Sequence, residues 1–233
     1  MSRPPAKSPH AGPPGEEEEY ISVWDLPTRL FHGLTIVLVV AAYATFRMNW
    51  MIWHARAGYA LLVLLTFRLA WGFFGAETAR FKNFLASPQC ALRHLNDLLR
   101  EGPDRHIGHN PAGGWMVLLL LALLFGQTLT GLYVDNEIAD QGPLSDITPA
   151  VVANFINALH DDYFWDALLV AIALHMLAIL FYAAKGRNLA LPMITGRMRV
   201  AKGAPRPAVG RPARALLLLA CSALFSAGLV HFL

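Results

Sequence analysis

The chain has 233 residues, of which 55% are hydrophobic and only 15% charged, with a formal net charge of +3. This charged fraction lies well below the roughly 25% of soluble domains, so the composition argues against a water-soluble protein. The two cysteines are far apart, and no CxxC or CxxCH motif occurs. Their placement argues against a thiolate metal cluster and against covalently attached c-type haem.

Five long segments nearly free of charged residues follow one another along the chain. Residues 1–20, rich in Pro, Gly and Glu, are expected to form a disordered cytoplasmic tail rather than a signal peptide. A transmembrane helix needs ~17–25 apolar residues, and its backbone polar groups must bond within the helix. The sequence therefore predicts an all-α, polytopic membrane protein. The expected helices cover about residues 27–46, 54–76, 112–134, 155–184 and, after a basic linker at 201–214, residues 215–233.

Positive and negative charges occupy different connections between these helices. Lys and Arg gather at residues 80–105 and 185–214, and none occurs between His106 and Ala184. The positive-inside rule places the N-terminus and both basic connections in the cytoplasm, and the C-terminus on the outer side. This distribution explains the net positive charge and argues against a nucleic-acid partner. The outer connection between the third and fourth helices carries six carboxylates, those of Asp135, Glu137, Asp140, Asp146, Asp161 and Asp162.

Four histidines lie on three of the predicted helices at two depths. His32 is at the cytoplasmic end of the first helix, and His54 is at the outer end of the second. On the fourth, His160 is at the outer end and His175 lies deeper. On an ideal α-helix these two side chains are about 22 Å apart along the axis and about 60° apart around it. The depths predict two pairs, an inner pair of His32 with His175 and an outer pair of His54 with His160.

Two imidazoles from two helices suit the two axial positions of a haem iron. Zinc and di-iron sites normally take more ligands from one cluster. A single histidine at a helix end commonly has no ligand, but four at matching depths predict two haems that are not attached covalently. Arg68 interrupts the second helix and is a candidate for the haem propionates. The remaining histidines have no partner at matching depth and are predicted not to be ligands: His10, His94, His106, His109 and His231.

Several segments of the chain resemble the bacterial cytochrome b561 family, which includes the b-type cytochrome subunits of nickel–iron hydrogenases. The similar blocks occur in family order over about residues 21–200. They are VWDLPTRLFHG at 23–33, WHARAGYALLVLLTFRLAWGFFG at 53–75, HNPAGGWMVL at 109–118, LTGLYVDNEIADQGPL at 129–144 and LHDDYFWDALLVAIALHMLAILFY at 159–182.

The resemblance implies a four-helix transmembrane bundle that holds two haem b groups, with the fifth helix as an addition. It implies the same four ligands, His32, His54, His160 and His175. The sequence departs from the family pattern at two neighbouring positions. Gly33 follows the first ligand where an aromatic residue is usual, and Asp161 follows the third where Glu is frequent.

The resemblance also implies a function, quinone-linked electron transfer in the bacterial inner membrane. The expected partner is a redox protein on the outer side, such as a hydrogenase, a c-type cytochrome or a molybdoenzyme. Quinone is expected near His32, Arg29 and Arg68. The acidic outer connection would attract a basic partner, or it merely follows the positive-inside rule. Two alternatives stay open, a self-contained oxidoreductase acting on a small species such as superoxide and a proton transporter lined by histidines.

Overall fold

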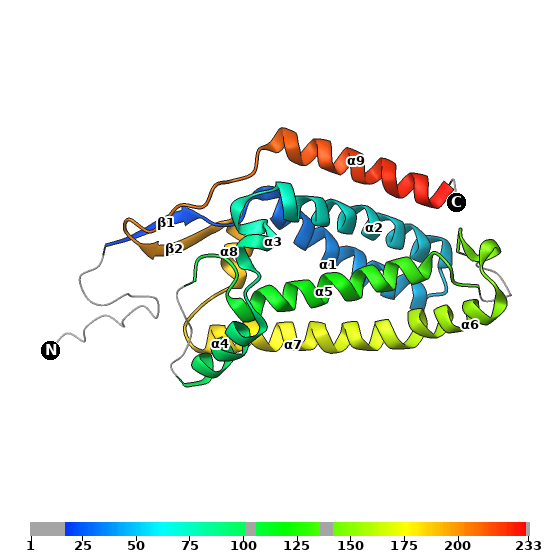
Figure 1. Ribbon diagram of the computed structural model, residues 1–233, viewed down its shortest axis with the longest axis horizontal. Helices are drawn as coiled ribbons and strands as arrows, with labels where there is room; N and C mark the ends of the chain where they lie inside the picture. Colours follow the sequence, from blue (N-terminus) through cyan, green and yellow to red (C-terminus); the bar gives the residue numbers. More distant parts are fainter. Residues whose placement is uncertain (1–16, 101–105, 136–141, 232–233) are drawn as a thin grey trace.

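The computed structural model describes residues 17–100, 106–135 and 142–231. It confirms the predicted all-α membrane fold, because five helical segments are long and apolar enough to cross a membrane. Four of them run side by side, and the fifth lies against the second (Figure 1). The five long helices are α1 (Leu26–Arg47), α2 (Met51–Phe74), α5 (Pro111–Gly131), α7 (Phe164–Ala184) and α9 (Pro212–His231).

Shorter elements connect these helices or extend them. Residues 1–16 of the expected tail lie outside the described part of the chain. The expectation was wrong for residues 18–20, which are part of the strand β1 and pair with β2. The short elements are β1 (Glu18–Ser22), η1 (Glu77–Ala79), α3 (Phe81–Phe84), α4 (Pro88–Arg100), η2 (Ser145–Ile147), α6 (Ala150–Ala158), η3 (Leu159–Tyr163), α8 (Ala190–Thr195) and β2 (Arg197–Ala201).

Polar side chains fix where the membrane helices begin. Asp25 caps α1 by accepting a hydrogen bond from the Thr28 N–H at 3.1 Å. Asn110 caps α5 by accepting one from the Gly113 N–H at 2.7 Å. The Asn110 side-chain amide also donates to the Tyr182 hydroxyl, so the start of α5 lies level with the end of α7. A proline follows each cap in the first turn, where its missing N–H costs nothing.

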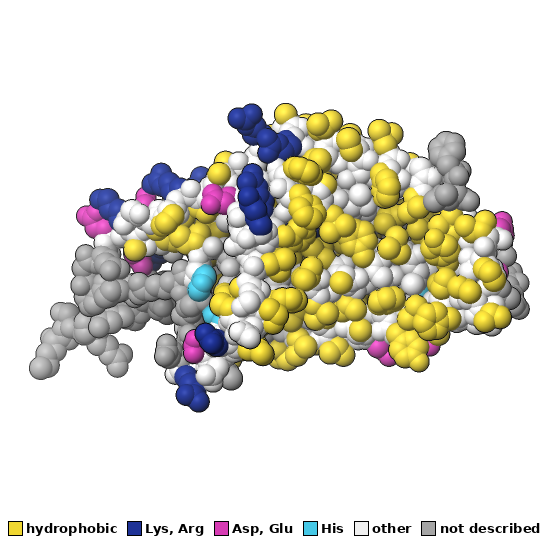
Figure 2. Space-filling view, in the orientation of Figure 1, with side chains coloured by type: hydrophobic (Ala, Val, Ile, Leu, Met, Phe, Trp, Pro, Cys, Tyr) yellow, Lys and Arg dark blue, Asp and Glu magenta, His cyan; other side chains and the backbone are white. Residues whose placement is uncertain are grey.

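The bundle core lies around α2, which contacts α1, α5 and α9. Leu65 is fully buried against the α5 and α7 side chains Leu121, Leu124 and Leu168. Most other large apolar side chains of the five helices are exposed on the outer surface of the bundle, as lipid contact requires (Figure 2). The chain thus buries a thin central core and leaves its remaining apolar surface to the membrane.

Basic side chains gather at one end of the bundle. On the face shown in Figure 2, Lys and Arg gather at the end where the antiparallel strands β1 and β2 pair. The acidic N-terminal strand neutralises part of the basic linker there, through ion pairs of Glu17, Glu18 and Glu19 with Lys202, Arg199 and Arg206 respectively. A hydrogen bond from the Gly203 N–H and the nearby Arg206 lower the pKa of Glu19.

We expect Asn110→Ala to lower the thermal unfolding midpoint of the detergent-solubilised protein, measured by circular dichroism. The substitution removes both a helix cap, worth about 1 kcal/mol by itself, and the hydrogen bond to Tyr182. Asn188→Ala is the control, because Asn188 accepts a backbone hydrogen bond from Leu191 at an exposed site. Equal shifts of the two midpoints would show that the Tyr182 bond adds no stability.

Candidate functional site

His54 and His160 lie together at one end of the bundle, which we call the His54 end. His54 is on the first turn of α2, and His160 is in η3, between α6 and α7. Their ring centroids are 6.2 Å apart, and the ring planes meet at 87°. Helix α1 turns into α2 beside them, with Asn49 at a positive φ of 57° in the turn. The tertiary structure therefore brings together the two residues of the predicted outer pair.

Each of these imidazoles is held by a main-chain carbonyl of a neighbouring helix. His54 Nδ1 is 2.9 Å from the Ala42 carbonyl oxygen of α1, and His160 Nδ1 is 2.8 Å from that of Gln127 of α5. A carbonyl only accepts hydrogen bonds, so Nδ1 must carry the proton in both rings. The lone pair is then on Nε2. Metal-ligating histidines typically have this second contact, which fixes both tautomer and ring orientation.

The spacing of the pair would allow both imidazoles to hold one iron, because ring centroids 6.2 Å apart leave room for a metal ion between the rings. A cavity of about 480 Å³ extends from both histidines and is lined mainly by apolar side chains of α1, α2, α5 and α7. At Gly58, which lines it, a Cβ atom would meet no atom within 4 Å. The residues present therefore fit a flat, largely apolar group such as haem b.

The helix that carries His160 is not the continuous α-helix that the sequence predicts. Residues Leu159–Tyr163 form a π-helix, which has a wider turn than an α-helix. The angle of about 60° expected between His160 and His175 therefore does not apply, because the π segment changes the phase of the helix. Such segments occur frequently at functional sites. No periodicity in the sequence indicated this one.

Glycines allow α5 to approach His160 closely. A Cβ atom on Gly131 would lie 2.8 Å from His160 Cε1, and one on Gly126 would lie 2.5 Å from the Phe164 ring. Gln127, between them, donates from its side-chain amide to the His160 carbonyl oxygen at 2.9 Å. The end of α5 thus packs against the π segment and bonds to its backbone.

The predicted inner pair lies closer to the other end of the bundle, which we call the Asp25 end. His32 on α1 and His175 on α7 are close enough to interact electrostatically, and both are half-buried. Within the described part of the chain, neither imidazole makes a hydrogen bond or a ring contact. Their proximity agrees with the predicted pairing, but their orientation is less fixed than that of the outer pair. Their role as ligands stays a prediction.

Arg68 is a buried cation near this inner pair. Its side chain is only 3% exposed, and its Nη1 atom has no hydrogen-bond partner. The guanidinium carbon lies 5.2 Å from the centroid of the Phe81 ring and 6.0 Å from that of Phe31. Asp25 interacts with it electrostatically but forms no ion pair within the described residues. A buried charge needs an anionic partner, and a haem propionate would supply one.

His109 belongs to this polar group, although the sequence analysis assigned it no role. Its ring lies 4.6 Å from the rings of both Trp24 and Phe84, and its Nδ1 atom is buried without a partner. Burial and the nearby charge of Arg68 lower the pKa of His109 to about 3, so the imidazole is neutral. The sequence did not indicate its burial, because His109 precedes α5 and is buried only by tertiary packing.

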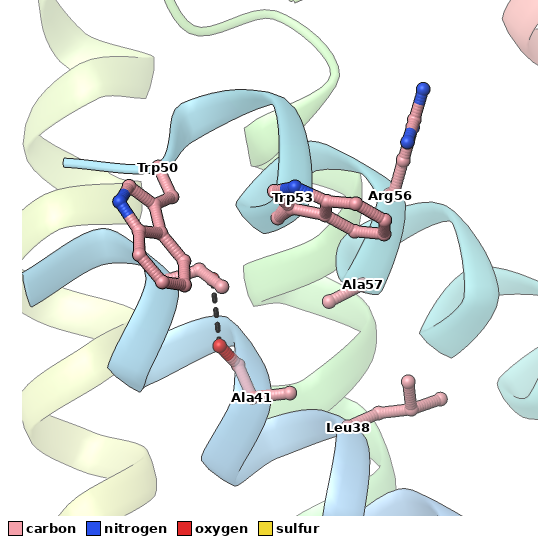
Figure 3. Close-up of a pocket in the computed structure, with 7 residues that line it drawn as sticks. Leu38, Ala41, Trp50, Trp53, Arg56 and Ala57 are labelled. Atoms are coloured by element: carbon pink, nitrogen blue, oxygen red, sulfur yellow. Dashed lines mark hydrogen bonds between the residues drawn. The ribbon is translucent and has the colours of Figure 1, made fainter. Parts of the chain in front are cut away.

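Two further arginines, Arg29 and Arg56, contact protein groups nearby. Arg29 donates to the Ile194 carbonyl oxygen. Arg56 stacks on Trp53, 4.7 Å from the ring centroid, beside a groove of about 490 Å³ between α1 and α2 (Figure 3). The Arg56 side chain points away from this groove, and the Thr45 hydroxyl is bonded to the Ala41 carbonyl oxygen. The groove is therefore an apolar surface and is not part of the histidine site.

One family model, described as prokaryotic cytochrome b561, matches residues 23–196, which is more than half of the chain. The matched region contains all four candidate histidines and Arg68, and it ends before α9. No curated protein and no solved structure matches the chain significantly.

We expect the four histidines to fall into two pairs when each is replaced by alanine. His54→Ala and His160→Ala should remove one redox component, and His32→Ala and His175→Ala the other, if each pair holds one haem as the sequence predicts. Potentiometric titration of the purified variants measures this, with His106→Ala as a control that keeps both components. Loss of the same component in His32→Ala and His54→Ala would contradict the pairing.

We expect Gly58→Leu to abolish binding of the outer haem while the protein still folds. The space beside Gly58 is open in the protein alone, so a larger side chain clashes only with a bound group. Gly228→Leu is a matched control, because a Cβ atom there also meets no atom within 4 Å. Haem content per chain and circular dichroism are measured for both. Full haem content in Gly58→Leu would show that the group does not occupy this cavity.

Proposed function

The chain belongs to the prokaryotic cytochrome b561 family, and on this premise we propose that it links the quinone pool to a redox partner protein. Members of the family are b-type cytochromes of the membrane, so the chain is a multi-pass membrane protein that binds b-type haem and transfers electrons. The finer assignments, the number of haems, the quinone link and the partner, are the proposal. When bound, haem b supplies a one-electron iron couple.

The observation that carries the proposal is the close pairing of His54 and His160, each with a fixed tautomer. Both rings donate Nδ1–H to a carbonyl, so both Nε2 lone pairs are available to one metal. If both imidazoles held the iron, no position on it would stay open to a gas or a substrate, which favours electron transfer over catalysis at the metal. The proton-transporter alternative receives no support here, since the Nδ1 protons of both rings are engaged by the backbone.

We assign His32 and His175 to a second haem and Arg68 to its propionates. Quinone would exchange at the Asp25 end, near His32, Arg29 and Arg68. This assignment is supported by the buried polar atoms there that have no partner, on Arg68 and on His109. The basic connections at this end support a cytoplasmic location for it by the positive-inside rule. The location proposed is therefore the bacterial inner membrane, with the Asp25 end inside.

The His54 end would then meet a partner on the outer side, either a soluble protein or one attached to the membrane. Hydrogenases, c-type cytochromes and molybdoenzymes are the classes that we consider. The acidic connection at this end supports a basic partner, although two of its carboxylates, Glu137 and Asp140, lie outside the described residues.

We expect the purified protein to contain two haem b groups per chain, both extractable with acid acetone and both reducible by a short-chain quinol. The pyridine haemochrome assay gives the number. Arg68→Gln should make the midpoint potential of one component more negative, because an ionised propionate that has lost its cationic partner disfavours the reduced form of the haem. Protonation of the propionate would cancel this effect, so the potential is measured above pH 7. Colourless protein, or a single haem in fully loaded protein, would contradict the proposal.

A further inference from the structure

Helix α6 extends beyond the other membrane helices at the His54 end. The Asn110–Tyr182 hydrogen bond places the start of α5 level with the end of α7, and the contact of Gly131 with His160 places the end of α5 level with η3. Residues 150–158 therefore lie past the end of α5. The helical segment Val151–Ala184 has 34 residues, or about 51 Å, against an apolar bilayer core of about 30 Å. Figure 1 shows α6 at the far end of the bundle.

One face of α6 carries large apolar side chains that nothing in the described structure covers. Val151 is 85% exposed, Phe155 62% and Val152 44%. Their spacing puts them on a single arc of about 100°. We call these three residues the α6 patch. Lipid explains such exposure alongside α5 and α7, whereas α6 lies past the end of α5 in a helical segment longer than the apolar layer is thick. A contiguous apolar patch exposed to water commonly marks an interaction site.

Exposed carboxylates lie on both sides of the α6 patch along the chain. Asp146 precedes it, and Asp161 and Asp162 follow it. The two arginines at this end, Arg47 and Arg56, belong to α1 and α2, and Arg56 is stacked on Trp53. The charge beside the patch is therefore negative, and a partner with basic residues around an apolar contact area would complement it.

We propose that the α6 patch and its flanking carboxylates form the docking surface for a basic redox protein. This inference rests on the proposed electron-transfer function. The patch precedes η3 directly, so a protein bound there is close to His160. The apolar contact would hold the complex, and the carboxylates would accelerate encounter. One electron passes to the oxidised partner in each encounter, and no proton or other atom is transferred.

The test uses the full-length, haem-loaded protein in phosphatidylcholine nanodiscs, reduced with dithionite and mixed with ferricytochrome c, a basic one-electron acceptor. We expect Val151→Ser/Phe155→Ser to lower the second-order rate at least tenfold. Phe225→Ser is the matched control, since Phe225 is 61% exposed but lies on the membrane helix α9, and it should leave the rate unchanged. Asp146→Asn/Asp162→Asn should lower the rate and flatten its salt dependence.

An unchanged rate in Val151→Ser/Phe155→Ser would overturn the docking surface. A second measurement asks whether lipid covers the patch instead. A spin label at position 155, in a chain with Cys90→Ser and Cys221→Ser, should collide with a water-soluble nickel chelate; collisions mainly with oxygen dissolved in lipid would overturn the proposal. Haem reduction by quinol is measured in the same variants. Its failure in the wild type would refute the quinone link alone, because the docking assay uses dithionite.

Discussion

The His54 end depends on two hydrogen bonds from an imidazole to the main chain of a neighbouring helix. The bond from His54 joins α2 to α1, and the bond from His160 joins η3 to α5. In lipid an unbonded polar group is costly, so each Nδ1–H needs such a partner. Because each bond uses Nδ1 as the donor, it also decides that Nε2 carries the lone pair. The same contacts therefore stabilise the bundle and prepare the site for a metal.

Close helix packing makes these two bonds possible. Gly131 has no side chain between α5 and the His160 ring, and any Cβ atom there would overlap with the ring. The π-helix at Leu159–Tyr163 changes the direction of the side chains that precede α7. The backbone of α5 at Gly131 thus limits the apolar cavity on the side of His160. On the side of Gly58 the cavity stays open, because no side chain fills the space there.

The Asp25 end has a different physical character. Its central feature is the cation of Arg68, which is buried among aromatic rings and forms no ion pair with any residue that the structure describes. Beside it, His109 is neutral and also has a buried atom without a partner. Outside the bundle, the acidic strand β1 neutralises part of the basic linker. One end of the protein therefore offers an unmatched positive charge, whereas the other offers oriented imidazoles and exposed carboxylates.

The sequence by itself determined the membrane class and the number of spans, because a segment that crosses lipid must be a long apolar helix. It also indicated His32, His54, His160 and His175 as a set, since depth in a membrane follows from position along a helix. It missed the π segment and the burial of His109. Only the tertiary structure decided these features, along with the tautomers of His54 and His160, because they depend on which carbonyl, ring or glycine of another helix lies opposite each side chain.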